Sequence, residues 1–561
     1  MNKFWFLNAF LALVFSLNSF GQKYLLQGVV RDSVNNKTIE SVVAQVMPVG
    51  VTNTAMLNEV SDVRGRFAFS LPAGRYLLAV KILGYTPLVR EISISSDIEL
   101  EFLLSPQTIS LGEVEVTSLI VHRKVRDLPT PITVVPSYKY NKLSAITLSN
   151  VLASEPGISM GNDGVWSTNI NIRGFNESRL VTLIDGNRVE TATDLTASLS
   201  MTDVNDIERV EVVKGAQSSL YGTGAMGGIV NIITKEGHFS EKPYFSGNII
   251  SGFASANKLF MNHADINTGS DKWYLRLSGA YGKADDIRTP EGVLPNSQFT
   301  TSNITAKVGV KPLENHIFNL QYQRNWSTDV GIPGGSAFPG PATATYTDIG
   351  RQLLAAGYEI KNIGAKLESL KLRYFLQYIQ RDVALYPNTV TLNPTPTGSQ
   401  RITPGLVTPI GDHFTQGGKL QSTWNLSDKN TLIAGLDLWS RKLYTERTKN
   451  ITVEVLNSQG AVVKTNNLVR GETPIPESSF TSTGVFIQDE SQMLDDKLTL
   501  IAGGRIDGIR VKNERGFDID YLITNGVRND TPPNQRITFE KSSKSSISWS
   551  ANTGMLYSLF K

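Results

Sequence analysis

Residues 206–235 read DIERVEVVKGAQSSLYGTGAMGGIVNIITK, and the fold prediction for this chain starts from them. DIERVEVVKG and GGIVNIITK are each rich in β-branched residues, which predicts two strands. The glycine-rich stretch between them predicts tight turns and a close approach of the backbone to its neighbours. The segment is therefore expected to form a strand, a glycine-rich loop and a second strand.

Gly222, Gly224 and Gly227 also spell GxGxxG, the pattern of dinucleotide-binding loops. That loop binds pyrophosphate only when a helix N-terminus follows the glycines. Here the next residues, IVNIITK, predict a strand, and no suitable ribose-binding acid follows. We interpret the glycines as structural and expect no nucleotide site.

The residues upstream predict a compact α+β domain over 127–238. The run SAITLSNVLASEPG predicts a helix with Ser144 as its N-cap and Pro156-Gly157 as its stop. NINIRGF and RLVTLIDGNRV predict strands, and the pair Asp185-Gly186 predicts a tight turn.

Residues 239–561 show a different pattern, in which long segments alternate apolar and polar side chains. In residues 273–281, WYLRLSGAY, most large apolar side chains occupy odd positions, and Arg276 and Ser278 occupy even ones. One face suits lipid and the other suits water, which favours a transmembrane antiparallel β-barrel. A soluble sandwich would also alternate, but many strands of this length favour the barrel.

The N-terminal part predicts secretion followed by a second small β-domain. Residues 1–21 combine Lys3, the apolar run FWFLNAFLALVF and a small-residue cleavage site, which is typical of a signal peptide. Short strands separated by Gly and Pro over residues 22–105 predict a β-sandwich, and 106–126 predict a linker. The expected fold class is mainly β: a sandwich, a small α+β domain and a barrel.

The α+β domain resembles, over its whole length, the plug of TonB-dependent outer-membrane receptors. The matching pieces are DLPTPITVVP, LSNVLASEPGI, NINIRGF, LVTLIDGNRV and the run 206–235. The resemblance implies a plug that occludes the barrel. It assigns structural or gating roles to Arg173, Gly174, Asp185, Gly186, Lys214, Gly215, Tyr221, Gly222, Gly227 and Gly228.

Arg173 and Lys214 fall where the family has plug cations that face barrel carboxylates. The family more often has arginine at the position of Lys214, and lysine keeps the charge but loses the bidentate geometry. A looser contact between plug and barrel is the expected consequence.

GEVEVTS in the linker resembles a TonB box, with Glu113, Val114, Glu115, Val116 and Thr117 as the segment that binds the partner. An extended peptide can add to an exposed sheet edge through backbone hydrogen bonds, which demand little of its side chains. Upstream, QGVVRD, DVRGRFAFSLPAGRYLLAV and VKILGYTP resemble the carboxypeptidase regulatory-like domain, a sandwich without catalytic residues of its own. It is expected to be either a signalling appendage or a spacer.

The composition excludes several chemistries. The chain has no cysteine and only five scattered histidines, so thiol catalysis, disulfides and a metal cluster are not expected. The net charge of +3 is too small for the chain as a whole to attract nucleic acid electrostatically. We expect no enzyme activity, no cofactor and no metal site.

The resemblance implies an outer-membrane receptor, with its N-terminal domain in the periplasm, that a TonB-type inner-membrane complex energises. An iron-siderophore complex is the leading ligand, and cobalamin, haem and oligosaccharides stay open. The Gly/Pro-rich residues 328–348 are the expected external ligand-binding loop. The rival class is a secreted β-sandwich adhesion or assembly protein, which would not need a plug.

The barrel is expected to be incomplete in this chain. About a dozen strands can be assigned after residue 240, whereas a plugged transporter has roughly 22. The last residues, SISWSANTGMLYSLFK, also predict a strand.

Overall fold

The computed structural model describes most of the chain and divides it into two compact units, Met1–Glu113 and Val114–Lys561. The residues described are 23–33, 36–49, 57–82, 85, 87–105, 115–116, 123–124, 131–139, 146–176, 179–189, 191–192, 196–215, 221–222, 224–334, 341–495 and 497–559. The predicted signal peptide, most of the predicted linker and Ser144 lie outside them. No helix among the described residues is long and apolar enough to cross a membrane.

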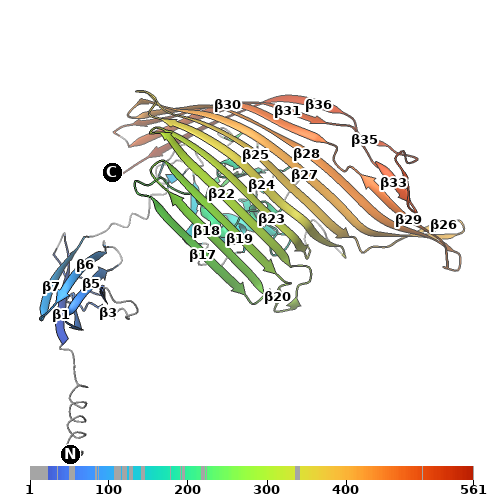
Figure 1. Ribbon diagram of the computed structural model, residues 1–561. Helices are drawn as coiled ribbons and strands as arrows, with labels where there is room; N and C mark the ends of the chain where they lie inside the picture. The colour runs from blue at the N-terminus through green and yellow to red at the C-terminus, as the bar shows by residue number, and fades with distance from the viewer. Residues whose placement is uncertain are drawn as a thin grey trace, which may run out of the picture. The chain divides into compact units, whose positions relative to one another are not determined.

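The N-terminal unit is a β-sandwich, as the strand spacing predicts. One sheet has the order β4-β1-β7 and the other the order β3-β2-β5-β6 (Figure 1). The strands are β1 Lys23–Asp32, β2 Val43–Pro48, β3 Leu57–Val60, β4 Arg66–Pro72, β5 Gly74–Lys81, β6 Leu88–Ile94 and β7 Ile98–Leu104. Alternate residues of each sheet, such as Leu26, Val46 and Phe102, are buried between them, which is how two amphipathic sheets form one core.

The plug contains a five-stranded sheet of order β10-β15-β16-β13-β14 and a hairpin of β11 and β12. Its strands are β10 Ile132–Pro136, β11 Ile158–Asn162, β12 Thr168–Ile172, β13 Leu180–Ile184, β14 Asn187–Arg188, β15 Ile207–Lys214 and β16 Gly228–Thr234. The strands β15 and β16 are the two predicted from residues 206–235, and they pair directly in antiparallel orientation.

The plug helix is shorter than the sequence predicts. Helix α3 spans Leu148–Leu152 with Thr147 as its N-cap, and the Thr147 backbone N–H donates to Asn150 Oδ1 at 3.0 Å. Leu148, Val151 and Leu152 are buried, as the predicted apolar face requires. Two 3-10 turns, η3 Thr196–Leu199 and η4 Val204–Asp206, lead into β15.

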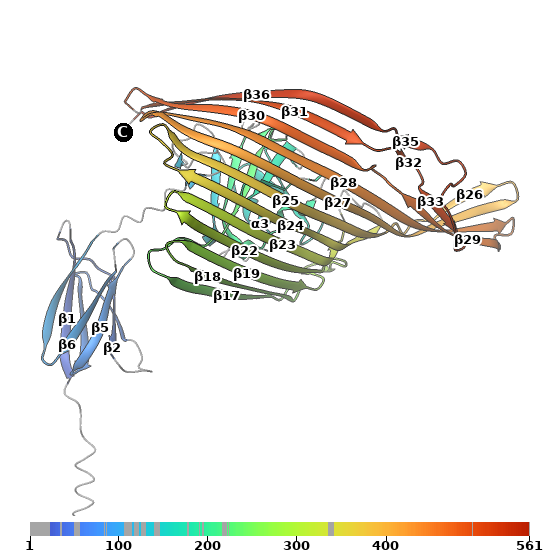
Figure 2. The same cartoon turned by 45° about the horizontal axis from the view of Figure 1, so that its top comes forward.

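The barrel sheet has 16 strands and curves around the plug (Figures 1 and 2). Its wall strands are β17 Tyr244–Ala254, β18 Leu259–Gly269, β19 Trp273–Ala284, β22 Phe299–Leu313, β23 His316–Ile332, β24 Thr343–Lys361, β25 Leu367–Tyr386, β27 Gly398–Ser427, β28 Asn430–Asn457, β30 Ser478–Met493, β31 Leu498–Asn513 and β36 Ser542–Tyr557. Each is antiparallel to its neighbours in the wall, and β17 pairs with β18 alone and β36 with β31 alone among the described residues.

Several strands extend beyond the wall. β27 and β28 are 30 and 28 residues long, far more than the roughly 9–11 residues that a tilted strand needs to cross a bilayer. Their far ends pair with β26 Thr391–Thr395 and β29 Val462–Glu472, and β29 pairs in turn with β33 Tyr521–Thr524, which pairs with β34 Val527–Asn529. These strands lie far from the plug (Figure 2). Two small ladders, β20 Arg288–Thr289 with β21 Gly292–Val293 and β32 Gly516–Phe517 with β35 Ile537–Phe539, lie in connections.

The predicted alternation matches the burial of the wall strands. On β19, Trp273, Leu277 and Tyr281 are exposed while Tyr274 and Arg276 are buried. On β31, Ile506 is exposed and its neighbour Arg505 is buried. On these two strands apolar side chains therefore face outward, and the polar side chains of Arg276 and Arg505 face the lumen that holds the plug.

The wall has one end with tight turns and one end with long connections. Residues 270–272, 314–315, 362–366 and 428–429 form short turns at one end of the strands. The longer segments 285–298 and 514–541 join strands at the other end. We call these the tight-turn end and the long-loop end.

An arginine on the outer surface is expected to destabilise the barrel. Val485 on β30 is 56% exposed and lies on the outward face, so Val485→Arg would place a charge in lipid at a cost of about 2–4 kcal/mol near mid-bilayer. Reversible urea unfolding in lipid vesicles measures this loss, and Val485→Leu is the matched control. Equal stability of the two variants would contradict a lipid-facing position.

Candidate functional site: the contacts between plug and barrel

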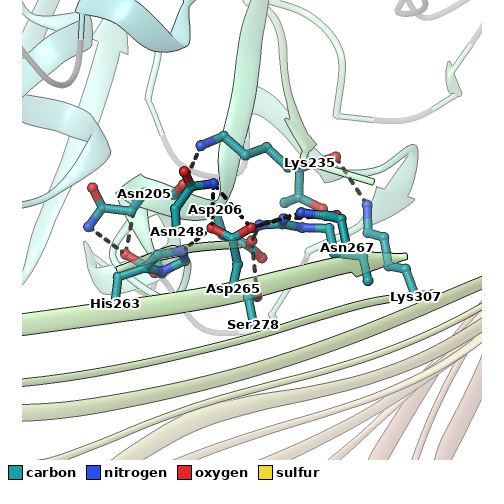
Figure 3. Close-up of polar contacts among 12 residues, drawn as sticks. Asn205, Asp206, Lys235, Asn248, His263, Asp265, Asn267, Ser278 and Lys307 are labelled. Carbon is teal, nitrogen blue, oxygen red and sulfur yellow. Dashed lines mark hydrogen bonds and ion pairs between the residues drawn. The ribbon is translucent and has the colours of Figure 1, made fainter. Parts of the chain in front are cut away.

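Three plug carboxylates form buried contacts with cationic or ionisable side chains of the barrel wall. Asp203, Asp206 and Asp185 face His263 on β18, Arg276 on β19 and Lys307 on β22 respectively. Figure 3 shows the polar network around Asp206 and Lys307, which joins plug turn η4 and β16 to the wall. We refer to these three contacts as the polar lock.

Arg276 is the centre of the polar lock. Its Nη2 atom donates to Asp206 Oδ1 at 2.6 Å, and its Nη1 atom donates to Asp265 Oδ1 at 2.9 Å. Ser278 Oγ also donates to Asp206 Oδ1, at 3.0 Å. Arg276 is 2% exposed and Asp206 is 3% exposed, so the ion pair is shielded from bulk water. Removing one partner of such a pair leaves a buried charge without compensation.

His263 bridges the plug and the wall beside this ion pair. Its Nδ1 atom lies 2.6 Å from Asp203 Oδ2, and its Nε2 atom lies 3.3 Å from Asp265 Oδ2 (Figure 3). Asp265 therefore contacts both His263 and Arg276. The two wall strands β18 and β19 hold one continuous hydrogen-bonded network against turn η4.

Asp185 lies in the tight turn that the sequence predicts between β13 and β14. Asp185 and Gly186 both have positive φ values, 50° and 77°, which is the geometry of a two-residue hairpin turn. Asp185 accepts hydrogen bonds from Thr234 N and Oγ1, and its Oδ2 atom lies 3.2 Å from Lys307 Nζ. Burial opposes ionisation, but the Lys307 ammonium and the Thr234 hydrogen bonds hold the pKa of Asp185 below its usual value.

Toward the long-loop end, the plug and the wall share an apolar core. Trp166 and Ile170 of the plug belong to the same buried cluster as wall residues Leu259, Ala284, Phe299, Val330, Ile332, Ala344, Tyr346, Ile349, Ile379 and Val383. The plug is thus held by charges in one half of the lumen and by apolar packing in the other.

The expected ligand-binding loop 328–348 is wrong in extent, because most of it is strand. β23 continues to Ile332 and β24 begins at Thr343, with Val330 paired to Tyr346 across the ladder. The reason is burial, because Val330, Ile332 and Tyr346 pack on the plug. The free energy gained by burying these apolar side chains outweighs the loop-forming tendency of the Gly/Pro-rich sequence. The connection is residues 333–342, of which 335–340 lie outside the described residues.

Arg173 and Lys214 do not form ion pairs with barrel carboxylates among the described residues. Lys214 is buried and its Nζ atom donates to the Pro156 carbonyl within the plug. Burial and the nearby Arg173 guanidinium lower the pKa of Lys214. Arg173 lies in an exposed turn with Gly174, where φ is 50° and 86°. In the contacts of the polar lock, the plug contributes the carboxylates and the barrel contributes the cationic or ionisable side chains.

Among the described glycines of the glycine-rich loop, Gly222 packs closely against the wall, and Gly227 and Gly228 pack closely within the plug. A Cβ atom on Gly222 would lie 3.1 Å from Arg505 Nη2, and the φ value of 75° also favours glycine there. A Cβ atom added to Gly227 would lie 2.4 Å from the Phe175 side chain. A Cβ atom added to Gly228 would lie 2.2 Å from the Val213 carbonyl oxygen. Gly215 has a φ value of 130° and nothing within 4 Å of an added Cβ.

Tyr221 is the one large side chain of this loop among the predicted site residues. Its carbonyl accepts a hydrogen bond from Arg188 Nη2, and Lys419 Nζ lies 5.3 Å from its ring centroid. Its backbone therefore contacts a plug arginine, and its ring contacts a wall lysine.

The predicted TonB box is described only at Glu115 and Val116, which form strand β8. This strand pairs in antiparallel orientation with β9, Arg123–Lys124. Glu113, Val114 and Thr117 lie outside the described residues. The backbone at the centre of the box is extended, as strand addition requires.

Of the residues in the polar lock, the sequence predicts a structural or gating role for Asp185 only. Asp206 belongs to the run 206–235 but has no predicted role, and His263 is one of the five scattered histidines. The alternation in residues 273–281 predicts that Arg276 and Ser278 face inward. This inward position is the sequence signal that points to the polar lock. No group of His, Cys, Asp and Glu side chains suitable for a metal ion occurs in the part of the chain that the structure describes.

A curved antiparallel sheet with an apolar outer surface, filled by a small domain held through buried charges, defines a plugged outer-membrane β-barrel. Residues 124–229 match the TonB-dependent receptor plug domain, and residues 300–559 match the TonB-dependent receptor-like β-barrel. Residues 26–116 match the CarboxypepD_reg-like domain. The chain belongs to the TonB-dependent receptors, with an N-terminal carboxypeptidase regulatory-like domain, and this barrel fold implies an outer-membrane location.

The curated relatives are named as transporters and receptors. The vitamin B12 transporter BtuB of Vibrio vulnificus (strain CMCP6) is 30% identical over 198 residues, covering 34% of this chain and 32% of the relative. The hemin receptor of Yersinia enterocolitica is 24% identical over 422 residues, covering 72% of this chain and 54% of the receptor. The chain therefore spans about a third to a half of the length of these two relatives.

Two solved structures illustrate the shared fold. The copper transporter OprC has a TM-score of 0.57 and 18% identity, covering 76% of this chain and 61% of its own. The ferric-catecholate import receptor Fiu from E. coli K12 in its open form has a TM-score of 0.54 and 16% identity, covering 80% of this chain and 70% of its own. At this identity the likeness concerns the fold alone.

Neutralising Asp206 is expected to loosen the plug. Asp206→Asn keeps the shape but leaves Arg276 with Asp265 as its remaining ion-pair partner in the described network, at a cost of about 2–3 kcal/mol. Hydrogen exchange of β15 amides relative to wall amides measures this change. Asp271→Asn, at an exposed turn position, is the control. Unchanged exchange in Asp206→Asn would show that the lock does not hold the plug.

Proposed function

We propose that this protein is an active transporter that takes up a scarce small-molecule ligand across the outer membrane. The observation that carries the proposal is the polar lock, which seats the plug in the lumen through buried pairs such as Asp206 with Arg276. A lumen closed in this way admits a ligand only if the plug rearranges. Because the pairs are buried, the rearrangement needs work.

A TonB-type inner-membrane complex would supply that work. Barrels of the outer membrane have short periplasmic turns and longer external loops, so the tight-turn end is assigned to the periplasm. Two of the three contacts of the polar lock lie toward this end, since Arg276 is three positions from the start of β19 at Trp273 and pairs across the ladder with Lys307. Force applied from the periplasm would therefore reach the lock before it reaches the apolar core.

The segment Glu113–Thr117 is the proposed site at which the complex pulls. β8 presents an extended backbone at Glu115 and Val116, and its ladder with β9 covers two residue pairs in the part of the chain that the structure describes. So short a ladder is easily exchanged for a longer one with a partner strand. The N-terminal sandwich would lie in the periplasm with this segment.

An iron-siderophore complex is the proposed ligand. Solved structures with this fold include the ferric-catecholate import receptor Fiu, a likeness that supports the choice at the level of fold only. Cobalamin and haem are the alternatives that the names of the relatives support, and oligosaccharide is a further one. Haem is less favoured because the chain has only five histidines, of which His263 contacts Asp203 and His413 is 2% exposed.

A secreted adhesion protein is the rival from another class. The strands of such a protein would not need apolar side chains that point outward along a long wall. Ile506, which is 60% exposed, is one of the outward apolar side chains in this protein. We further propose that the protein is not an enzyme and needs no cofactor of its own.

Deleting the gene is expected to reduce uptake of iron-siderophore complexes by cells under iron limitation. Radiolabelled iron accumulation measures the loss, and a plasmid copy of the gene is the control. Normal uptake of every chelate, together with lost growth on cobalamin, haem or a glycan, would reassign the ligand.

Val116→Pro is expected to abolish energised uptake and leave external ligand binding nearly unchanged. Proline removes a backbone donor and fixes φ, so the segment can no longer add fully as a strand. Val116→Ala keeps the donor and should be mild. Transport at the normal rate by the proline variant would rule out this position for the box.

A further inference from the structure

His263 faces a carboxylate at each of its two ring nitrogens. Its Nδ1 atom lies 2.6 Å from Asp203 Oδ2 of the plug, and its Nε2 atom lies 3.3 Å from Asp265 Oδ2 of the same wall strand (Figure 3). An ionised carboxylate only accepts hydrogen bonds, and a neutral imidazole has one donor and one acceptor. A neutral ring could therefore donate to only one of the two carboxylates, whereas an imidazolium donates to both.

The buried charges around His263 also favour the imidazolium. Among the described residues, the charged side chains that face this site come from turn η4, β18 and β19 and are 7% exposed or less: Asp203, Asp206, Asp265 and Arg276. β17 contributes the neutral side chain of Asn248, and the plug cation Lys235 donates to the Asn205 carbonyl instead. Three carboxylates thus surround one guanidinium, and a proton on His263 supplies a second buried cation to pair with them.

The proton on His263 joins the plug to the wall. Asp203 belongs to the plug and His263 to β18, and the ring is 1% exposed while turn η4 is in contact with the wall. If η4 leaves the wall, the ring loses Asp203 and meets water. A histidine in water loses its proton near about pH 6.5. Above that pH, the closed state therefore holds a proton that the opened state releases.

We propose that the polar lock is proton-dependent, so that protonated His263 fastens turn η4 to β18 and alkaline pH releases the turn. Histidine is the side chain of this network that ordinarily changes charge between pH 5 and 8. The inference deepens the proposed transport function, on which its biological role rests. It adds that the acidity of the surroundings regulates how readily the plug separates from the wall.

Proton linkage gives the sign and the size of the effect. Below about pH 6.5 both the closed and the opened state hold the proton, so the equilibrium constant for opening of η4 does not change with pH. Above it, the opened state holds one proton fewer. The equilibrium constant for opening then rises about tenfold per pH unit, until His263 loses its proton in the closed state as well.

Nitrogen NMR of the whole chain with labelled histidine, in lipid vesicles, tests the protonation state. The chain has five histidines, and at about pH 7.5, roughly one unit above the value for free histidine, His263 is expected to give an imidazolium signal. His263→Gln should remove that signal. His413→Gln is the matched control, because His413 is 2% exposed and neither ring nitrogen has a hydrogen-bond partner. A neutral His263 ring at this pH overturns the proposal.

Hydrogen exchange of the same sample at several pH values measures the opening of η4. The Asp206 amide donates to the Asp203 carbonyl at 3.0 Å, and the Lys235 amide donates to the Asp206 carbonyl at 2.7 Å, so both amides report this turn. Their rates are divided by those of wall amides, because base catalysis accelerates both equally. The ratio is expected to be constant in acid and to rise about tenfold per pH unit above about pH 6.5. A ratio that does not change with pH overturns the proposal.

Asp203→Asn separates the proton from the packing of the turn. The amide can donate to Nδ1 of a neutral ring, whose Nε2–H then donates to Asp265, so the contacts remain but the pH dependence is expected to disappear. His413→Gln should keep the full pH dependence. An Asp203→Asn protein that also keeps it overturns the proposal, even if His263→Gln does not assemble. Because these measurements use no ligand, failed uptake of every chelate would refute the transport proposal and leave the proton-dependent lock standing.

Discussion

The structure depends on the rule that a buried charge needs a partner. Arg276 is 2% exposed, and it can stay ionised in the lumen only because Asp206 and Asp265 lie within hydrogen-bonding distance. Because one of these carboxylates belongs to the plug and the other to the wall, the same charge sets the position of the plug against β18 and β19. The pairs of Arg276 with Asp206 and Asp265 therefore link the pairing of β18 and β19 to the position of the plug.

The two halves of the lumen hold the plug by different forces. Apolar packing around Trp166, Val330 and Tyr346 falls off gradually as surfaces slide, whereas the ion pairs of the polar lock break over a short distance. A pull that first reaches the lock would meet its largest resistance at the start of the motion.

Much of the fold could be predicted from the sequence, because local residue patterns determine the strands, their two faces and the tight turns. The period of two along β19 and β31 follows from the pleat, in which successive side chains point to opposite faces. Strands β15 and β16 and the turn at Asp185 and Gly186 follow from β-branched runs and from glycine's access to positive φ. The extent of residues 328–348 and the start of α3 at Leu148 could not be predicted, because burial against distant elements overrode local propensity.

The sequence by itself determined the plug, the sandwich and the two faces of the barrel strands. It could also place Arg276 on the lumen side, since alternation is a property of a single strand. Only the tertiary structure decided which charges meet. Asp206 and Arg276, or Arg441 and the Thr191 carbonyl, lie far apart in the chain, and their pairing depends on how the sheet curves around the plug. No local pattern encodes that curvature, so the polar lock is visible only in three dimensions.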